Sequence, residues 1–325
     1  MPGFTTHYIF GMKAYNDMPF TPLKHTIAKY RWLYQLGLQG PDMFFYNIPI
    51  LRHRDYRNVG SYMHEHKVNA FFECCLRRIG TIRSRQQQEE AISYLAGFIN
   101  HYIADSICHP YVYGRIGYPV DAPTSMHHGM HAHLENELDA ILLWKYKKKK
   151  PSEFNQTATI CLNGQEIQFI SHFLASCINE TYYPITYRNN FQVTPAMVHR
   201  SIWALRFGCR TLSDKNGKKK FGIAQVESIF VNHPVASAKM VTDSVTDYRS
   251  SCNLNHEAWS NPWDPTRVST ASFVDLFHET LDKCSRAYAL LNSAVTDNMP
   301  LDKQDLSPLL AELGNESYHS GLPVD

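Results

Sequence analysis

Three residues that can bind a metal ion follow one another at four-residue intervals in the segment GFINHYIADSICHP. They are His101, Asp105 and His109. Residues four apart lie on one face of an α-helix, about one turn from each other. A second pair with the same interval, His131 and Glu135, follows in the segment MHAHLENELD. We therefore expect two helices that project imidazole and carboxylate groups towards a shared site, as a multinuclear zinc site between helices requires.

The apolar pattern of the whole chain is helical, because apolar and aromatic residues recur at three- and four-residue spacing. With 325 residues, of which 44% are apolar, the chain can bury a large core. Neither an internal repeat nor a Ser/Gly-rich linker divides it, so we expect a single all-α domain over residues 1–325. The expected helices span 23–37, 61–79, 87–108, 127–146, 166–180, 195–212 and 272–293.

The sequence also predicts the end of one helix and the character of the C-terminal tail. Pro110 follows His109 directly and is expected to end that helix, because the residue before proline is pushed out of the α conformation. Residues 296–325 form a C-terminal tail, which from Met299 onward is expected to be a short docked helix with a frayed end.

Strand signal is scarce in the sequence. In Thr157–Phe169, Asn163-Gly164 suits a type I′ turn between β-compatible flanks, so a small surface hairpin is expected within residues 155–170. Loops are expected at Gly114–Thr124, Ser213–Gly222 and Asn253–Pro265.

Charge and composition limit the function classes. A formal net charge of +2 gives no electrostatic reason to expect a nucleic acid as partner. The first residues, MPGFTTHYIFGMKAY, lack the pattern of a signal peptide, and no apolar run is long enough for a membrane span. The eight cysteines form no CxxC pair, so we expect reduced thiols and a cytoplasmic protein. Composition says nothing of the oligomeric state.

The alternation of histidine and carboxylate has a chemical reason. Zinc accepts nitrogen and oxygen ligands, and a catalytic site keeps one position for water. A carboxylate between two histidines on one helix can bridge two ions, while each imidazole closes one side. The run at residues 101–109 therefore predicts neighbouring zinc ions rather than a single one.

With these segments the chain resembles the zinc-dependent phospholipase C family, whose relatives include the S1/P1-type nucleases. The resemblance extends from residue 3 to about residue 293 and implies an all-helical bundle that holds three zinc ions. The segments that carry it are Thr5-Thr6-His7, Gly40-Pro41-Asp42, Gly60-Ser61-Tyr62-Met63-His64, the run His101/Asp105/His109, and His131/Glu135 with Asn136 and Asp139.

The resemblance implies a set of ligands for each ion. It assigns one zinc ion to Asp42, His64, His101 and Asp105, and a second to His109, His131 and Glu135. A third ion would share Asp105 with His7 and, in secreted members, with the amino group of an N-terminal tryptophan. This chain has no tryptophan at its start, which leaves two or three ions as alternatives.

Two local alternatives also stay open. His66 competes with His64, although the Gly-x3-His phrase favours His64. His133 competes with His131, because His133 and Glu137 have the same spacing as His131 and Glu135.

The resemblance implies a zinc-dependent phosphodiester hydrolase in which a metal-activated water attacks phosphorus. Asp42 is expected to act as general base, because its family counterpart holds that position. The expected substrate is a phosphoester or a phospholipid headgroup, and aromatic residues near the predicted ligands could enclose a quaternary ammonium group. The alternatives are an S1/P1-type nuclease and a metal-binding scaffold without catalysis.

Overall fold

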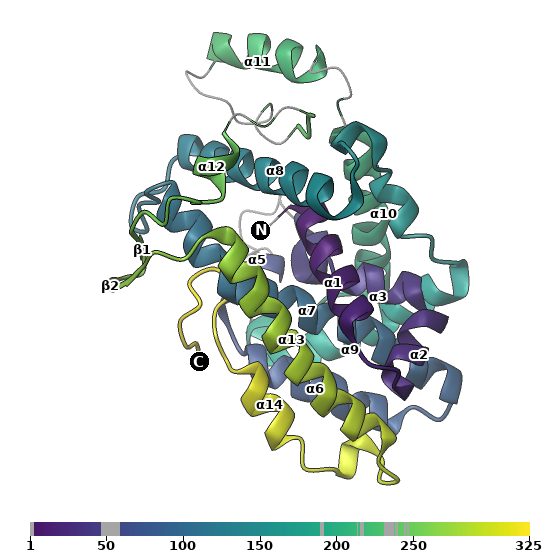
Figure 1. The fold of residues 1–325 in the computed structure, drawn as a ribbon. Helices are drawn as coiled ribbons and strands as arrows, with labels where there is room; N and C mark the ends of the chain where they lie inside the picture. Colours follow the sequence, from purple (N-terminus) through teal and green to yellow (C-terminus); the bar gives the residue numbers. More distant parts are fainter. Residues whose placement is uncertain are drawn as a thin grey trace.

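The structure is a computed structural model that describes residues 3–46, 59–188, 192–212, 214, 218–230, 237, 240–243, 245 and 247–325. Most regular structure in these residues is helical, which confirms the all-α prediction (Figure 1). The first elements are α1 (Phe4–Asp17), α2 (Pro22–Lys29), α3 (Arg31–Gly37), the 3₁₀ helix η1 (Gly40–Tyr46), α5 (Val59–Glu65), α6 (Val68–Thr81), α7 (Arg85–Arg115) and α8 (Ser125–Lys147). They are followed by η2 (Pro151–Glu153), η3 (Gln156–Thr159), α9 (Gly164–Arg188), α10 (Pro195–Leu212), α11 (Lys218–Phe230), α12 (Tyr248–Ser251), β1 (Trp259–Asn261), β2 (Asp264–Ser269), α13 (Phe273–Thr296), η5 (Leu301–Lys303) and α14 (Ser307–Leu313).

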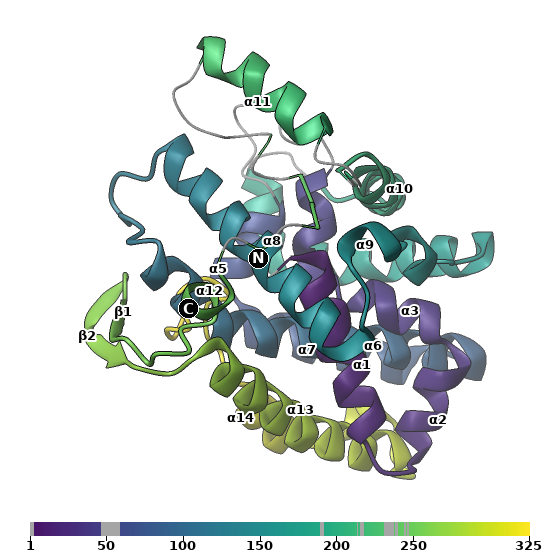
Figure 2. The same ribbon diagram turned by 45° about the horizontal axis from the view of Figure 1, so that its top comes forward.

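Helix α7 is the helix around which the others pack. From Ala91 to Val112 nearly every residue is buried. Helices α1, α3 and α13 pack against it, and Figures 1 and 2 show it enclosed by the bundle. The buried apolar side chains form two neighbouring clusters, both of which contact Ile107 and Leu281. A helix that is enclosed on all sides must also bury its polar residues, and α7 carries three of the predicted ligands.

The predicted hairpin at residues 155–170 is wrong, because this segment forms η3 and the start of α9. The Oδ1 atom of Asn163 accepts the Glu166 N–H at 2.9 Å, and the Glu166 carboxylate accepts the Asn163 N–H at 2.8 Å. This reciprocal pair is a capping box. Asn163 therefore begins a helix instead of occupying the first position of a turn.

The only strand pair in the described residues lies elsewhere, at β1 and β2, in a segment whose first part was expected to be a loop. The strands are antiparallel and pair Trp259 with Ser269. The indole N–H of Trp259 donates to the Ala271 carbonyl at 2.9 Å, and its ring packs edge-on against Tyr111. Because the strand residues are few and mostly polar, no alternating apolar pattern marks them in the sequence.

Pro110 does not end the helix that carries His109, contrary to the prediction, because α7 continues to Arg115. A proline inside a helix costs about 3 kcal/mol through the lost hydrogen bond and the ring clash. The turn after it is held by tertiary contacts: Tyr111 is buried and donates its hydroxyl to the Ser251 carbonyl at 2.8 Å. His109 consequently lies within the helix and keeps the helical geometry of His101 and Asp105.

Each expected helical segment contains helix, with shifted limits. The segment 23–37 divides at Tyr30 into α2 and α3, and 61–79 divides into α5 and α6 next to Lys67, whose φ is 49°. Helices α1 and α11 were not expected, and α11 begins inside the predicted loop Ser213–Gly222. No helix in the described part of the chain has both the length and the apolar character that crossing a membrane requires.

The C-terminal tail contains the expected docked helix, α14, but the chain after it is not frayed. Residues 314–325 run back towards α5 and α7 (Figure 1). The Lys67 N–H donates to the Asp325 main-chain oxygen at 3.0 Å, and the Asn69 N–H donates to the Asn315 side chain at 3.0 Å. These contacts connect the tail with the start of α6, so it forms part of the fold.

The first turn of α1 depends on a buried carboxylate from another helix. Asp139 on α8 accepts the N–H groups of Thr5 and Thr6 at 3.1 and 2.7 Å. Helix N-terminal N–H groups have no partner within their own helix, so Asp139 caps α1. Asp139→Ala should lower the free energy of unfolding by about 1–2 kcal/mol, measured by urea denaturation in EDTA. The matched control is Asp121→Ala at an exposed position, and equal stability of the two variants would contradict the cap.

Candidate metal centre

The buried face of α7 carries its three predicted ligands as the spacing implied. His101, Asp105 and His109 are all fully buried. Because α7 is the central helix, the elements that pack on it bring the other predicted residues to the same face. These residues are His7 on α1, Asp42 on η1, His64 on α5, and His131 and Glu135 on α8.

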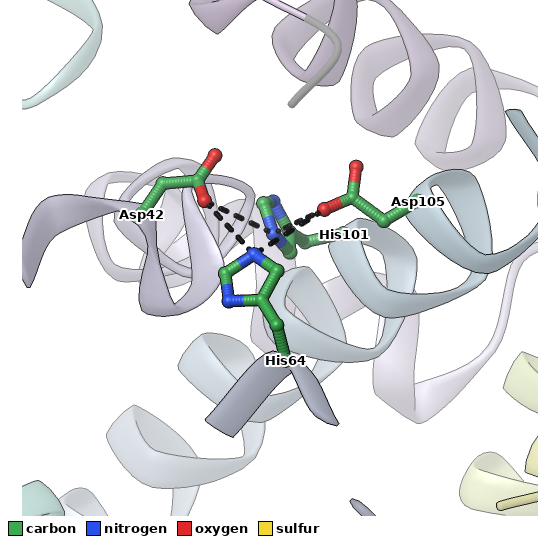
Figure 3. Close-up of side chains that lie close together, drawn as sticks. All are labelled: Asp42, His64, His101 and Asp105. Atoms are coloured by element: carbon green, nitrogen blue, oxygen red, sulfur yellow. Dashed lines mark ion pairs between the residues drawn. The ribbon is translucent and has the colours of Figure 1, made fainter. Parts of the chain in front are cut away.

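A first group of side chains that could hold a metal ion consists of Asp42, His64, His101 and Asp105, whose ligand atoms all lie within 4.8 Å of one another. Figure 3 shows the four side chains converging from η1, α5 and α7. The Nε2 atom of His64 is 3.2 Å from Asp42 Oδ1, and that of His101 is 3.1 Å from Asp105 Oδ2. The sequence-based grouping of these four residues agrees with this geometry.

Main-chain carbonyl groups orient three of the imidazole rings. The Nδ1 atoms of His64, His101 and His109 lie 2.7, 3.1 and 2.7 Å from the carbonyl oxygens of Gly60, Leu38 and Tyr318, respectively. A carbonyl can only accept, so each Nδ1 donates, and in the neutral ring Nε2 then carries a lone pair. Such carbonyl contacts fix the tautomer and ring direction of metal-binding histidines.

The loop before η1 is fitted to the ring of His101. Gly40 has a φ of +46°, in the left-handed region, and a Cβ atom there would lie 2.2 Å from His101 Cδ2. Only glycine can adopt this φ without strain and also leave room for the ring of His101. Asp42 is two residues further along the chain, so this close contact also fixes where Asp42 faces His101.

Several polar atoms in the centre make no hydrogen bond within the described residues, although they are buried. Such atoms cost about 1–3 kcal/mol each when they have no partner, so their convergence needs an explanation. A bound cation explains it, because nitrogen and carboxylate oxygen are zinc ligands. The atoms are Asp42 Oδ1, His64 Nε2, His101 Nε2, Asp105 Oδ1 and Oδ2, and His109 Nε2.

A second group that could hold a metal ion consists of His109, His131 and Glu135. Glu135 Oε1 lies 2.6 Å from His131 Nε2 and 3.6 Å from His109 Nε2. Burial raises the pKa of the Glu135 carboxyl well above its usual range. It also lowers the pKa of His109 and of His131 well below theirs. A cation at this position would offset the cost of burying the glutamate as an anion.

Asp105 belongs to the first group and also lies beside His7 and His109. Its carboxylate is 3.1 Å from His7 Nε2, 3.7 Å from His64 Nε2 and 3.7 Å from His109 Nδ1. Burial opposes its ionisation, but the imidazoles of His109, His101 and His7 together hold the pKa of this carboxyl well below its usual range. These neighbours therefore favour the ionised form of the carboxylate.

His7 is fully buried and stacks on His101 with ring centroids 4.0 Å apart. Among the described residues it faces Asp105 but belongs to neither group of three or more ligand atoms. The structure therefore brings all eight predicted residues together, with His7 at the margin.

The geometry discriminates between the alternative histidines. His66 stacks on Tyr62, with centroids 4.1 Å apart, and lies outside both groups. His133 is half-exposed and its Nε2 is 3.6 Å from Glu137. The positions of His64 and His131 thus fit the predicted site, and those of His66 and His133 do not.

The C-terminal tail and the turn between β1 and β2 add residues that the sequence did not indicate. Tyr318 supplies the carbonyl that orients His109, and the ring of His319 stacks on His64, with centroids 4.9 Å apart. Trp263, in the turn between β1 and β2, packs at right angles on Tyr113, whose ring is 4.5 Å from that of His131. These residues are isolated in the sequence and follow no spacing rule, so no local signal points to them.

Comparison with known proteins agrees with this geometry. No curated protein and no solved structure matches the chain. The model of one family, described as zinc dependent phospholipase C, matches residues 6–186, which is more than half of the 325 residues. The matched range includes every predicted ligand from His7 to Glu135. This chain belongs to the zinc-dependent phospholipase C family.

Proposed function

We propose that the protein is a zinc-dependent phosphodiester hydrolase that acts on the headgroup of a phospholipid. The observation that carries this proposal is the pair of adjacent ligand groups, in which Asp105 of the first group approaches His109 of the second to 3.7 Å. Zinc, if held by these residues, would supply charge neutralisation at the phosphate oxygens and activation of a water molecule at neutral pH. Membership of the family supports both the metal and the substrate class.

Asp42 is the proposed general base. Its Oδ1 atom faces the first group, 3.2 Å from His64 and 3.9 Å from His101, and makes no hydrogen bond within the described residues. A carboxylate in that position can accept a proton from the attacking water. Asp105 keeps its negative charge among the imidazoles and holds the two groups together.

Aromatic rings beside the second group suit a headgroup cation. Tyr113, Tyr118 and Trp263 are half-buried and pack against one another at centroid distances of 4.7 to 6.0 Å. Ring faces attract a quaternary ammonium group by cation–π interaction. These rings therefore favour a choline phospholipid over a phosphodiester without a cationic group.

Two alternatives use the same metal site. An S1/P1-type nuclease would need a positively charged track for the strand, and the near-neutral net charge of +2 argues weakly against such a track. A non-catalytic scaffold is the other alternative, because among the described residues His7 belongs to neither ligand group. Both alternatives predict zinc binding, so they are separated from the proposal by turnover.

The metal content and substrate preference can be measured together. Protein purified free of metal and then dialysed against zinc should contain at least two zinc equivalents by elemental analysis. It should hydrolyse phosphatidylcholine and bis-p-nitrophenyl phosphate, and it should lose this activity with a chelator. Cleavage of single-stranded DNA without lipid turnover would favour the nuclease, and less than one zinc equivalent would contradict the metal site.

The role of Asp42 is tested by Asp42→Asn, which preserves the shape and one potential metal-binding oxygen. We expect kcat to fall about 10²- to 10⁴-fold, the range for loss of a general base, while most of the zinc remains. Asp121→Asn at an exposed position is the control. If Asp42→Asn retains a third or more of the activity, another group must accept the proton.

The shared position of Asp105 predicts unequal metal loss. Asp105→Ala should abolish activity and release more than one zinc equivalent, because its carboxylate faces both groups. His131→Ala should release about one equivalent, and His133→Ala, on the same helix but half-exposed, none. The loss of thermal stability should follow the loss of zinc, largest in Asp105→Ala and smallest in His133→Ala, since ions bound only to the folded state stabilise it. Equal zinc loss in Asp105→Ala and His131→Ala would contradict a bridging role.

A further inference from the structure

The tail after α14 reaches the metal centre from outside the region that matches the family. The matched residues end at 186, whereas the part of the tail that follows α14 is residues 314–325. The N–H of Tyr318 donates to the His64 carbonyl at 2.9 Å, and its own carbonyl accepts from His109 at 2.7 Å. One tail residue therefore contacts a histidine of each ligand group, and its side chain is buried.

The tail is held firmly on both sides of this contact. Ser317 accepts the N–H groups of His319 and Ser320 through its hydroxyl, at 3.1 and 3.3 Å. The Ser320 carbonyl in turn accepts the side-chain N–H of Asn261, at 2.7 Å. The backbone on both sides of His319 is thus fixed, which places its side chain in a defined position.

The ring of His319 lies against one histidine of each group. It is nearly parallel to His64, with an angle of 16° and centroids 4.9 Å apart, and its centroid is 5.6 Å from that of His109. His319 nevertheless belongs to neither group of potential ligand atoms. Its ring therefore borders the space between the two groups, where a phosphate shared by two ions would lie.

The partner of His319 differs in kind from those of the neighbouring histidines. Its Nδ1 atom is 3.2 Å from the hydroxyl of Tyr113, whereas His64 and His109 face carbonyl oxygens. A hydroxyl can donate to Nδ1, and the proton of the neutral ring then resides on Nε2. Among the described residues the hydrogen bonds of His319 involve its Nδ1 atom and its main-chain N–H, so an N–H group at Nε2 can donate to a ligand.

We propose that His319 is a further catalytic residue, whose Nε2–H donates a hydrogen bond to a phosphoryl oxygen of the substrate. This inference rests on the proposed phosphodiester hydrolysis. Negative charge grows on the phosphoryl oxygens as water attacks, so a fixed donor stabilises the transition state more than the bound substrate. No covalent bond forms to the ring, and no proton leaves it.

The test compares three substitutions at this position. His319→Phe keeps a stacking ring without a donor, His319→Ala removes both, and His319→Gln keeps an N–H group near the position of Nε2. His278→Gln, on the exposed face of α13, is the control. Each variant is examined for zinc content, thermal midpoint, kcat and KM on phosphatidylcholine, and binding of inorganic phosphate by calorimetry.

We expect His319→Phe and His319→Ala to lower kcat about 10²- to 10³-fold, with less change in KM and with zinc content unchanged. Binding of inorganic phosphate should weaken about tenfold or more, because a hydrogen bond to a charged group is lost. His319→Gln should recover at least tenfold of the lost kcat. The control should behave as the wild type in all four measurements.

Other results would overturn the inference. Loss of about one zinc equivalent in all three variants would make His319 a ligand. Activity of His319→Phe within threefold of the wild type, or of His319→Gln equal to His319→Phe, would exclude a donor role. If the wild type hydrolyses no phosphodiester, the proposed function fails. Phosphate binding then tests His319 separately, because unchanged binding in His319→Phe would reject a hydrogen bond from its ring.

Discussion

The burial of one carboxylate among several imidazoles is the interaction on which the rest of the structure depends. Asp105 is fully buried on α7 and faces His7, His64, His101 and His109. An isolated buried carboxylate is too costly to keep ionised, so its partners must be brought close and oriented. The elements that carry these partners, α1, α5 and α7 itself, pack where this requirement places them.

The sequence predicted the part of the site that depends on local geometry. His101, Asp105 and His109 share a face because a helix repeats every 3.6 residues, whatever surrounds it. His7, Asp42 and His64 were expected from the resemblance alone, since no spacing rule relates them to α7. The positions that favour His64 over His66 and His131 over His133 depend on packing between distant segments.

The predictions that were wrong also have physical causes. Asn163-Gly164 fits both a tight turn and a helix start, and the reciprocal bonds with Glu166 decide for the helix. Pro110 is tolerated because the following turn is packed against α12 and β1, a tertiary effect that overrides the local preference. His319 reaches the site through contacts between residues more than 200 positions apart, which no window of sequence can contain.

The carbonyl of Tyr318 orients His109 through the main chain, so every residue type at position 318 would offer the same acceptor. The constraint therefore applies to the path and length of the chain between α14 and this contact rather than to the identity of one side chain. Insertions or deletions there would turn the ring of His109, whereas many substitutions would not. In related chains this part of the metal centre can be conserved as a distance along the tail while its residues vary.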